Sequence, residues 1–299
     1  MKIEGFYIYS FYRFFDHAQK TASKKKLDLF TSDKYVRGTI LLADEGINGT
    51  ISGKRKDLDE IISFIRKILK IKKLNIKINH NSFLPFNRLK IRLKKEIVSL
   101  GQGYLNIDKN SARLIHPADW NNIITDKSTT VIDVRNQFEI KIGKFKNAHN
   151  PKTDSFRDFP KQIKKMKLKK DRKIAMYCTG GIRCEKASAY MKMHGYRNIV
   201  QLSGGIINYL RYQNEKKIKN YWNGECFVFD DRVTINENLT KGKYLQCYGC
   251  RRPITKQDTL SIEYQKGVCC PYCFNERSDA QKNSSKSRQK QIELANEKR

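Results

Sequence analysis

The chain has 299 residues, of which 39% are hydrophobic, enough for two ordinary domains and a smaller third. Its 61 lysines and arginines against 30 acidic residues give a formal net charge of +31, which favours a polyanionic partner. No apolar run reaches the roughly 20 residues that span a bilayer, and the first residues lack a secretory signal, so we expect a cytoplasmic protein without membrane association.

The excess of basic residues has two interpretations. A nucleic-acid-binding surface would produce it, but so would a genome that favours lysine, isoleucine and asparagine codons. The basic runs are spread along the chain, at 24–26, 66–77, 88–95, 161–173 and 216–217. The charge therefore favours nucleic acid as a partner without identifying which one.

Residues 1–100 predict a ferredoxin-like, or acylphosphatase-like, domain. The order of its expected elements is β-α-β-β-α-β, with an acidic cap at Asp16 opening the first helix. Basic side chains alternate along 88–92, so one strand face there is a candidate nucleic-acid surface, with a solvated face as the alternative. The expected strands are 6–9, 39–43, 50–52 and 74–78, and the expected helices are 16–30 and 56–69.

A connector at 101–125 and a second α/β domain at 126–222 follow. In the connector, residues 116–120 begin a short helix whose Trp120 is expected to anchor the next domain. The apolar strands of that domain, separated by helices, predict a parallel sheet covered on both faces. Its expected strands are 129–134, 173–177 and 199–202, and its expected helices are 155–166, 183–193 and 205–212.

The segment from Cys178 to Arg183, Cys-Thr-Gly-Gly-Ile-Arg, lies where a buried strand ends and a helix begins. The two glycines let the backbone curl so that N–H groups point inward, and the helix adds its positive end. Both effects favour a thiolate at Cys178, and Arg183 adds a fixed charge, so these are the predicted catalytic residues. The alternative is a buried cysteine at an ordinary glycine-rich turn.

The length of this loop separates two chemistries. Cysteine-dependent phosphatases need one more residue before the arginine to hold a phosphate, whereas the shorter loop suits one additional sulfur atom, that is, a persulfide. The next residue, Cys184, could act as a resolving thiol, but small buried packing is the favoured interpretation. Asp133 and Arg135 are expected to be structural partners beneath the loop rather than catalysts.

Cysteines concentrate in a small domain predicted at 223–275, which precedes a polar tail at 276–299 that we expect to be partly disordered or weakly helical. Two Cys-x-x-Cys pairs with 19 residues between them predict a four-thiolate structural zinc site, with reduced cysteines or an iron–sulfur cluster as alternatives. Neighbouring Cys269 is expected to be a bystander, and Cys226 a core residue. The predicted ligands are Cys247, Cys250, Cys270 and Cys273.

Several segments resemble one family over residues 1 to about 275. The loop at 178–186, Cys-Thr-Gly-Gly-Ile-Arg-Cys-Glu-Lys, resembles the active loop of the rhodanese-domain tRNA uridine hydroxylases. The paired cysteine motifs add to this likeness. Further similar segments are Ala-Asp-Glu-Gly-Ile-Asn-Gly-Thr at 43–50, Glu-Ile-Val-Ser-Leu-Gly at 96–101, Ile-Asp-Val-Arg-Asn at 132–136, Phe-Arg-Asp-Phe-Pro at 156–160 and Trp-Asn-Gly-Glu-Cys-Phe-Val-Phe-Asp at 222–230.

The resemblance implies a rhodanese domain at 126–222 and an enzyme that converts the wobble uridine (position 34) of tRNA to 5-hydroxyuridine with molecular oxygen as co-substrate. tRNA is then the partner, and no obligate protein partner is indicated. The family's catalytic cysteine maps onto Cys178, whose thiolate is hypothesised to add to the uracil ring. A sulfurtransferase remains an alternative, since a persulfide-forming cysteine predicts sulfur transfer. A non-catalytic RNA-binding protein with a relic rhodanese domain is a further alternative.

Overall fold

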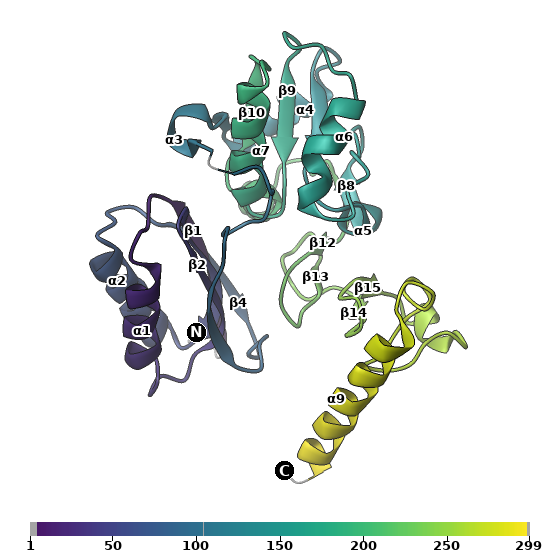
Figure 1. Cartoon of the computed structure of the whole chain (residues 1–299). Helices are drawn as coiled ribbons and strands as arrows, with labels where there is room; N and C mark the ends of the chain where they lie inside the picture. Colours follow the sequence, from purple (N-terminus) through teal and green to yellow (C-terminus); the bar gives the residue numbers. More distant parts are fainter. Residues whose placement is uncertain (1–4, 104, 298–299) are drawn as a thin grey trace. The chain divides into compact units, whose positions relative to one another are not determined.

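The computed structural model describes residues 5–103 and 105–297, which Figure 1 shows in colour along the chain. The chain divides into two compact units, Met1–Gly224 and Glu225–Arg299. Among the described residues, no helix is both long and apolar enough to cross a membrane. The predicted fold class is confirmed, because the first unit contains two α/β parts, one with a parallel sheet, and the second contains the cysteine cluster.

The N-terminal part of the first unit is a five-stranded sheet in the order β4-β1-β3-β2-β5, with both of its helices on one face (Figure 1). The predicted β-α-β-β-α-β order is present, and β5 extends it by pairing parallel to β2. Helix α2 buries the apolar stripe that its periodicity predicted. The elements are β1 (Phe6–Phe14), α1 (Lys20–Phe30), β2 (Arg37–Ala43), β3 (Gly46–Gly53), α2 (Arg55–Leu69), β4 (Asn75–Asn81) and β5 (Leu89–Leu93).

Helix α1 begins later than the sequence predicted. It starts at Lys20, and no side chain caps its first turn, so the acidic cap expected at Asp16 is wrong. The backbone N–H of His17 donates to the carbonyl oxygen of Asp44 at 2.8 Å, which holds this stretch against the turn between β2 and β3. Residues 15–17 thus belong to the connection that precedes the helix.

The second part of the first unit contains a four-stranded parallel sheet in the order β6-β10-β9-β7. Every residue of β7, β9 and β10 is buried, which explains why most of their residues are apolar, the exceptions being Thr130, Asp133 and Gln201. The edge strand β6 lies inside the predicted connector, and its three residues are too few to show a pattern. The strands are β6 (Arg113–Ile115), β7 (Thr130–Asp133), β9 (Ile174–Tyr177) and β10 (Ile199–Leu202).

Helices accompany this sheet, with α3 beside α7 and α4 beside α8. The helix expected at 155–166 is instead a short 3-10 turn, η1, followed by α6. Pro160 has no backbone N–H and therefore fits the first turn of a new helix, not the middle of a longer one. The elements are α3 (Ile107–Asn110), α4 (Pro117–Thr125), α5 (Gln137–Ile142), η1 (Phe156–Asp158), α6 (Phe159–Lys165), α7 (Ile182–Met193) and α8 (Gly205–Lys216), with a separate strand pair β8 (Gly143–Phe145) and β11 (Trp222–Gly224).

Trp120 in α4 is fully buried, as an anchor of this part should be. Its ring lies 6.2 Å from that of Phe145 and 6.4 Å from that of Tyr177, the residue that immediately precedes the thiol loop. Aromatic pairs of this kind bury a large apolar area in a defined geometry. This aromatic cluster therefore packs against the end of β9, the strand that leads into Cys178.

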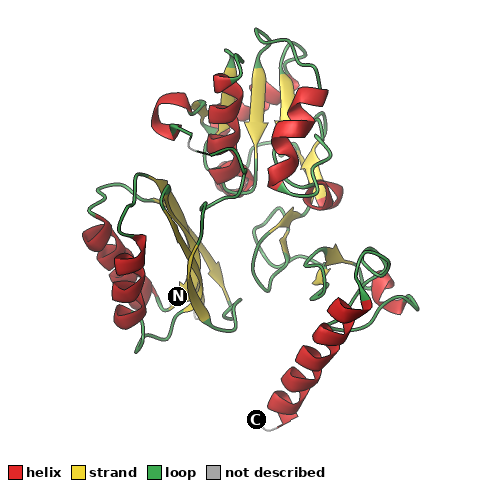
Figure 2. Cartoon of the chain, in the orientation of Figure 1, coloured by secondary structure: helices red, strands yellow, loops and turns green. Residues whose placement is uncertain are grey.

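The second unit consists mainly of loops with short paired strands and a long C-terminal helix (Figure 2). Helix α9 is continuous where the sequence predicted a partly disordered or weakly helical tail. Side chains on either side of its start tie it down, because Arg277 donates to the carbonyl of Gly249 at 2.7 Å and Arg288 to that of Gly267 at 2.9 Å. The elements are β12 (Cys226–Phe227), β13 (Thr234–Ile235), β14 (Leu245–Gln246), β15 (Pro253–Ile254), η2 (Gln257–Leu260) and α9 (Asp279–Glu297).

Candidate active site

The thiol loop joins the end of β9 to the start of α7. The N–H of Gly181 donates to the Cys178 sulfur at 3.0 Å, and Gly181 adopts φ +104°, which favours glycine. On the outer side, the carbonyl of Cys178 accepts from the N–H of Ile206 at 3.0 Å, at the start of α8. Carbonyl groups are thus drawn away from the sulfur while N–H groups face it, as the loop sequence predicted.

This surrounding holds Cys178 as an anion although the residue is only 1% exposed. Burial raises the pKa of its thiol, but a hydrogen bond with the Cys184 side chain, the charge of Arg183 and the N–H groups of Cys184 and Gly181 outweigh burial and lower the pKa to about 5. The thiolate is therefore the dominant form at neutral pH, and it is the thiolate that reacts as a nucleophile.

Arg183 does not point freely into the loop. Its two terminal nitrogens form a bidentate pair with the carboxylate of Glu139, with Nη1–Oε2 at 2.6 Å and Nη2–Oε1 at 2.8 Å. Glu139 is fully buried, and it also closes a capping box with Asn136 at the start of α5. Glu139, which sequence reasoning missed, thus partly neutralises the charge of Arg183. A direct part of Arg183 in catalysis stays a prediction.

Asp133 and Arg135 form a second ion pair, and neither side chain is exposed to solvent. The Nη2 atom of Arg135 lies 2.6 Å from Asp133 Oδ2, and its Nη1 donates to the carbonyl of Glu139 at 3.3 Å. The Arg135 guanidinium also lies 5.0 Å from the ring centre of Trp222. These contacts support the structural interpretation, because they use the guanidinium inside the fold.

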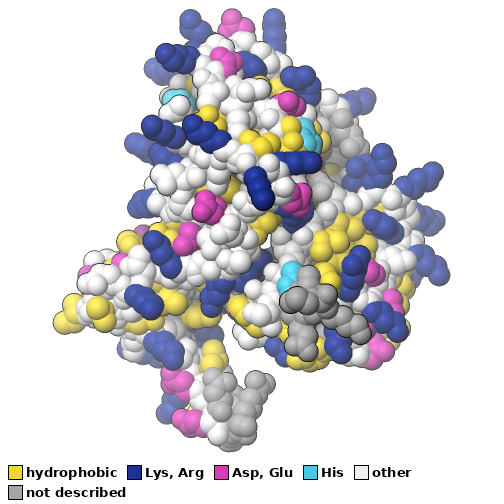
Figure 3. Space-filling model, turned by 180° about the vertical axis from the view of Figure 1, so that it is seen from behind, with side chains coloured by type: hydrophobic (Ala, Val, Ile, Leu, Met, Phe, Trp, Pro, Cys, Tyr) yellow, Lys and Arg dark blue, Asp and Glu magenta, His cyan; other side chains and the backbone are white. Residues whose placement is uncertain are grey.

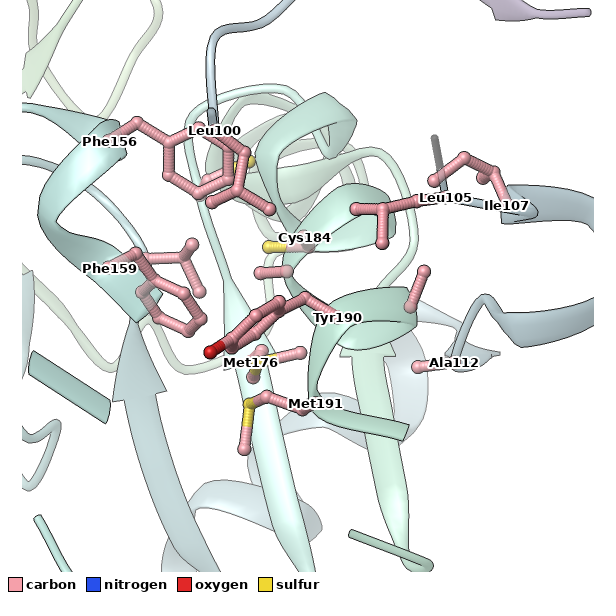
Figure 4. Packing of buried hydrophobic residues seen from close by; sticks show 14 of the residues in the cluster. Leu100, Leu105, Ile107, Ala112, Phe156, Phe159, Met176, Cys184, Tyr190 and Met191 are labelled. Carbon is pink, nitrogen blue, oxygen red and sulfur yellow. The ribbon is translucent and has the colours of Figure 1, made fainter. Parts of the chain in front are cut away.

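Cys184 packs into the apolar core of the second α/β part. Figure 4 shows its side chain among Leu100, Phe156, Phe159 and Tyr190, and the residue is fully buried. Burial raises the pKa of its thiol, and the hydrogen bond with Cys178 raises it further. At neutral pH, Cys184 is therefore a protonated thiol that donates to the Cys178 thiolate.

Residues of the N-terminal part approach the thiol loop from the other side. The hydroxyl of Tyr12 donates to Glu185 Oε1 at 2.6 Å, and the Lys77 ammonium donates to the carbonyl of Gly180. Burial lowers the pKa of Lys77 to about 8, against the opposing effect of the Cys178 charge. Sequence reasoning did not identify Tyr12 or Lys77, because each is an ordinary member of a strand and far from the loop in sequence.

A cavity of about 160 Å³ lies where these two parts meet. Its wall includes the loop residue Gly181 and polar side chains from both parts, among them Tyr12, Lys77, Glu185 and Gln201. The predicted loop therefore borders a polar cavity that the sequence did not reveal.

In the second unit, the four predicted zinc ligands come together. Their sulfur atoms all lie within 4.8 Å of one another, and three pairs are at 3.8–3.9 Å. Zn–S bonds of about 2.3 Å in a tetrahedron imply sulfur–sulfur distances of about 3.8 Å, so this geometry fits a zinc ion. Cys269 is not part of the cluster, since its thiol faces the carbonyl of Glu263 at 3.4 Å.

A parallel α/β domain that holds a thiolate in a curled strand-to-helix loop defines a protein of the rhodanese class. Family comparison agrees, since residues 116–211 match the rhodanese-like domain and residues 6–97 match the UPF0176 acylphosphatase like domain. The chain is also 44% identical over 295 residues to a tRNA uridine(34) hydroxylase from Pelagibacter ubique, which covers 97% of this chain and 95% of that protein. The chain therefore belongs to the tRNA uridine(34) hydroxylase family, which confirms the predicted resemblance.

Solved structures are similar to about a third of the chain. A rhodanese-related protein from Thermoplasma volcanium is 32% identical and covers 33% of this chain and 92% of its own, with a TM-score of 0.29. A rhodanese-like domain protein from Staphylococcus aureus is 22% identical over 32% of this chain and 90% of its own, with a TM-score of 0.28.

Proposed function

We propose that this protein is a tRNA-modifying enzyme that hydroxylates the wobble uridine, position 34, at C5, with molecular oxygen as co-substrate. The observation that carries the proposal is the Cys178 thiolate, held by an intact loop in a chain that is 44% identical to a tRNA uridine(34) hydroxylase over nearly its whole length. A relic domain without activity would have no need for a loop that lowers the pKa of its cysteine to about 5.

The charge of the chain supports tRNA as the substrate, and with it a cytoplasmic location. The formal net charge is +31, and Figure 3 shows lysine and arginine side chains over much of the face drawn, with few acidic ones between them. Such a distribution attracts phosphates without reading a base sequence. Selection of the uridine therefore needs groups that contact the base itself.

The role of Cys178 in the proposal is one covalent step. The thiolate adds to C6 of the uracil ring, and the electron pair of the C5–C6 double bond moves toward the C4 carbonyl oxygen. C5 thereby becomes the nucleophilic carbon, which is the atom that must react with oxygen. Hydroxylation also consumes two electrons from an external two-electron reductant, so that one atom of O₂ stays on C5 as the hydroxyl and the other leaves as water. Loss of the C5 proton and of the thiolate from C6 then restores the ring, so Cys178 is returned unchanged.

A sulfurtransferase is the second candidate, because the same N–H groups that stabilise a thiolate would stabilise a persulfide on Cys178. The two candidates predict different products in tRNA. Loss of Cys178 removes 5-hydroxyuridine in the first case and a thiolated nucleoside in the second.

The test is nucleoside mass spectrometry of tRNA from cells in which Cys178→Ser replaces the natural chain. We expect 5-hydroxyuridine to fall to the level of a deletion strain, and an adduct between protein and RNA to be trapped only with Cys178 present. Cys226→Ser is the matched control, since Cys226 is equally buried but lies outside the loop. Normal 5-hydroxyuridine in the Cys178→Ser strain would exclude the proposal.

We also propose that Cys247, Cys250, Cys270 and Cys273 hold a structural zinc ion. The chemistry of four thiolates and their mutual distances support it. The ion would join two turns in a unit whose cysteine-centred apolar cluster is small, and so replace a larger core. It has no part in the covalent step assigned to Cys178.

A further inference from the structure

The thiol loop is held from outside through its carbonyl groups. The carbonyls of Cys178 and Thr179 accept from N–H groups in the first turn of α8, at 3.0 and 3.3 Å. The next carbonyl, that of Gly180, accepts instead from the ammonium of Lys77, which lies on β4. Two of these three carbonyls are therefore held from within the second α/β part, and the third is held by the N-terminal part.

The carbonyl that Lys77 holds belongs to the same peptide unit as the N–H that faces the thiolate. The C=O of Gly180 and the N–H of Gly181 are joined by one trans peptide bond, and in a planar trans peptide these two groups point in opposite directions. With Lys77 on the side of the oxygen, the N–H is turned inward, where it donates to Cys178 Sγ at 3.0 Å. The ammonium also polarises the peptide, which makes its N–H a stronger donor.

This peptide needs an external support because both residues that flank it are glycines. Glycine backbones rotate with little steric resistance, so the Gly180–Gly181 peptide can turn over more easily than its neighbours. A turned peptide would direct its carbonyl oxygen at the Cys178 sulfur and repel the thiolate. The bond from Lys77 to the oxygen opposes this rotation.

Lys77 is itself a buried cation, with only 9% of its surface exposed. Burial lowers the pKa of its ammonium to about 8, so at neutral pH it is mostly charged. An ammonium so far from water needs a specific partner, which the loop carbonyl supplies. The groups that face it are Cys178, Cys184 and Glu185, whose charges favour the ammonium, Arg211, whose charge disfavours it, and Tyr12, whose ring centre lies 5.5 Å from Nζ.

We propose that Lys77 is a positioning residue of the thiol loop, which fixes the Gly180–Gly181 peptide with its N–H toward Cys178, so that the N-terminal part completes the thiolate site. Lys77 acts through the peptide and does not touch the reacting atoms. The inference goes beyond the proposed function, because a fixed loop serves hydroxylation and sulfur transfer alike.

The test observes this one peptide by NMR in the full-length protein. The sequence contains two Gly–Gly pairs, at 180–181 and 204–205. Glycine labelled with ¹³C at its carbonyl and ¹⁵N at its nitrogen therefore gives HNCO signals from the N–H groups of Gly181 and Gly205 alone. The Gly181 signal reports the bond to the thiolate. The Gly205 signal, from the start of α8, reports whether the neighbouring fold is intact.

In the natural chain, the Gly181 signal should move as Cys178 ionises, with a midpoint near pH 5. In Lys77→Met we expect this movement to shrink while the Gly205 signal stays in place, because the Gly181 N–H no longer faces the sulfur. The pKa of Cys178 should rise from about 5 toward the ordinary thiol value of about 8.5. The pH dependence of Cys178 alkylation, followed by peptide mass spectrometry, measures that pKa independently of the NMR signal.

Two further variants provide controls. Lys77→Arg retains a cationic donor and should keep both the movement of the Gly181 signal and the low pKa of Cys178. Lys192→Met is the matched control, since Lys192 on α7 also donates to a backbone carbonyl, that of Ser111, at 2.7 Å, and it should keep both features as well.

The two readouts separate positioning from simple charge. An unchanged signal and pKa in Lys77→Met would overturn the assignment. A raised pKa with the full movement of the Gly181 signal would also contradict it, because Lys77 would then act on Cys178 by its charge alone. If Gly181 depends on Lys77 but a Cys178→Ser strain keeps its 5-hydroxyuridine, the proposed function fails and the positioning role stands.

Discussion

At the residue scale, the central feature is the lowered pKa of two buried groups, one in the thiol loop and one beside it. The pKa of Cys178 is lowered to about 5 and that of Lys77 to about 8. Burial raises the pKa of Cys178, but the Cys184 side chain, the charge of Arg183 and the N–H groups outweigh it. Burial lowers the pKa of Lys77, and the charges of Cys178 and Glu185 oppose it only in part. Between these two pKa values the thiol is ionised while the amine still carries its proton.

A pH profile of hydroxylation follows from these values. As pH rises through about 5, Cys178 ionises and kcat/KM should increase, by about tenfold per unit below that pKa. As pH rises through about 8, Lys77 loses its proton and can no longer donate as a cation, so kcat/KM should fall. Initial rates on a tRNA substrate across this range measure both limbs.

Lys77→Arg serves as the control for the upper limb, because a guanidinium keeps its charge over the whole range. Its profile should lose the fall near pH 8 and keep the rise near pH 5. A rise centred near the ordinary thiol pKa of about 8.5 would show that the loop does not activate Cys178.

At the element scale, the two Cys-x-x-Cys turns are expected to stabilise the second unit in place of a larger apolar core. Each Cys-x-x-Cys pair turns tightly and presents two sulfur atoms, and the apolar side chains around them are few. Binding energy for a metal is then largely folding energy for that unit.

Replacement of one ligand should therefore remove the metal and loosen this unit. We expect Cys270→Ser to lower the zinc content per chain from one to near zero, as measured by mass spectrometry of the intact protein under native conditions, and to make residues 245–275 sensitive to protease. Cys269→Ser should retain the zinc, because its thiol faces Glu263. Equal zinc content in both variants would exclude the four-thiolate site.

At the scale of the first unit as a whole, one buried lysine joins the N-terminal part to the helix that follows the thiol loop. Lys186, on α7, is 1% exposed, and its ammonium contacts the carboxylates of Glu45 and Glu96 and the carbonyl of Val98 at 2.9 Å. Such a lysine fixes orientation more than it adds stability, because its charge must first be desolvated. This clamp ties the turn between β2 and β3, which contains Glu45, to α7.

Removal of the lysine leaves two partly buried carboxylates without their counter-charge. We expect Lys186→Met to lower the free energy of unfolding by about 3 kcal/mol in urea titrations. Lys141→Met, at an exposed position of α5, should change it by less than about 0.5 kcal/mol. Equal effects of the two substitutions would show that the ion cluster is not a clamp.

Features that neighbouring residues encode could be predicted from the sequence alone. The thiol loop, the buried strands β7, β9 and β10, the amphipathic α2 and the two cysteine pairs all depend on spacing within a few residues. Periodicity was weaker where elements are short or held from outside, as for β6 and the start of α1. Those boundaries are set by tertiary hydrogen bonds that override local preference.

The residues that complete the site became evident from the three-dimensional fold. Glu139 and Arg183 are 44 positions apart in the sequence, and Tyr12 and Glu185 are 173 apart. Neither pairing can be predicted from the spacing of neighbouring residues. Lys77 is an ordinary strand residue until the fold places its ammonium at the loop carbonyl. Local sequence can place the reactive sulfur and curl the backbone around it. The groups that neutralise the neighbouring charge, cover the sulfur and line the cavity come from distant segments. Only the packed fold brings them together.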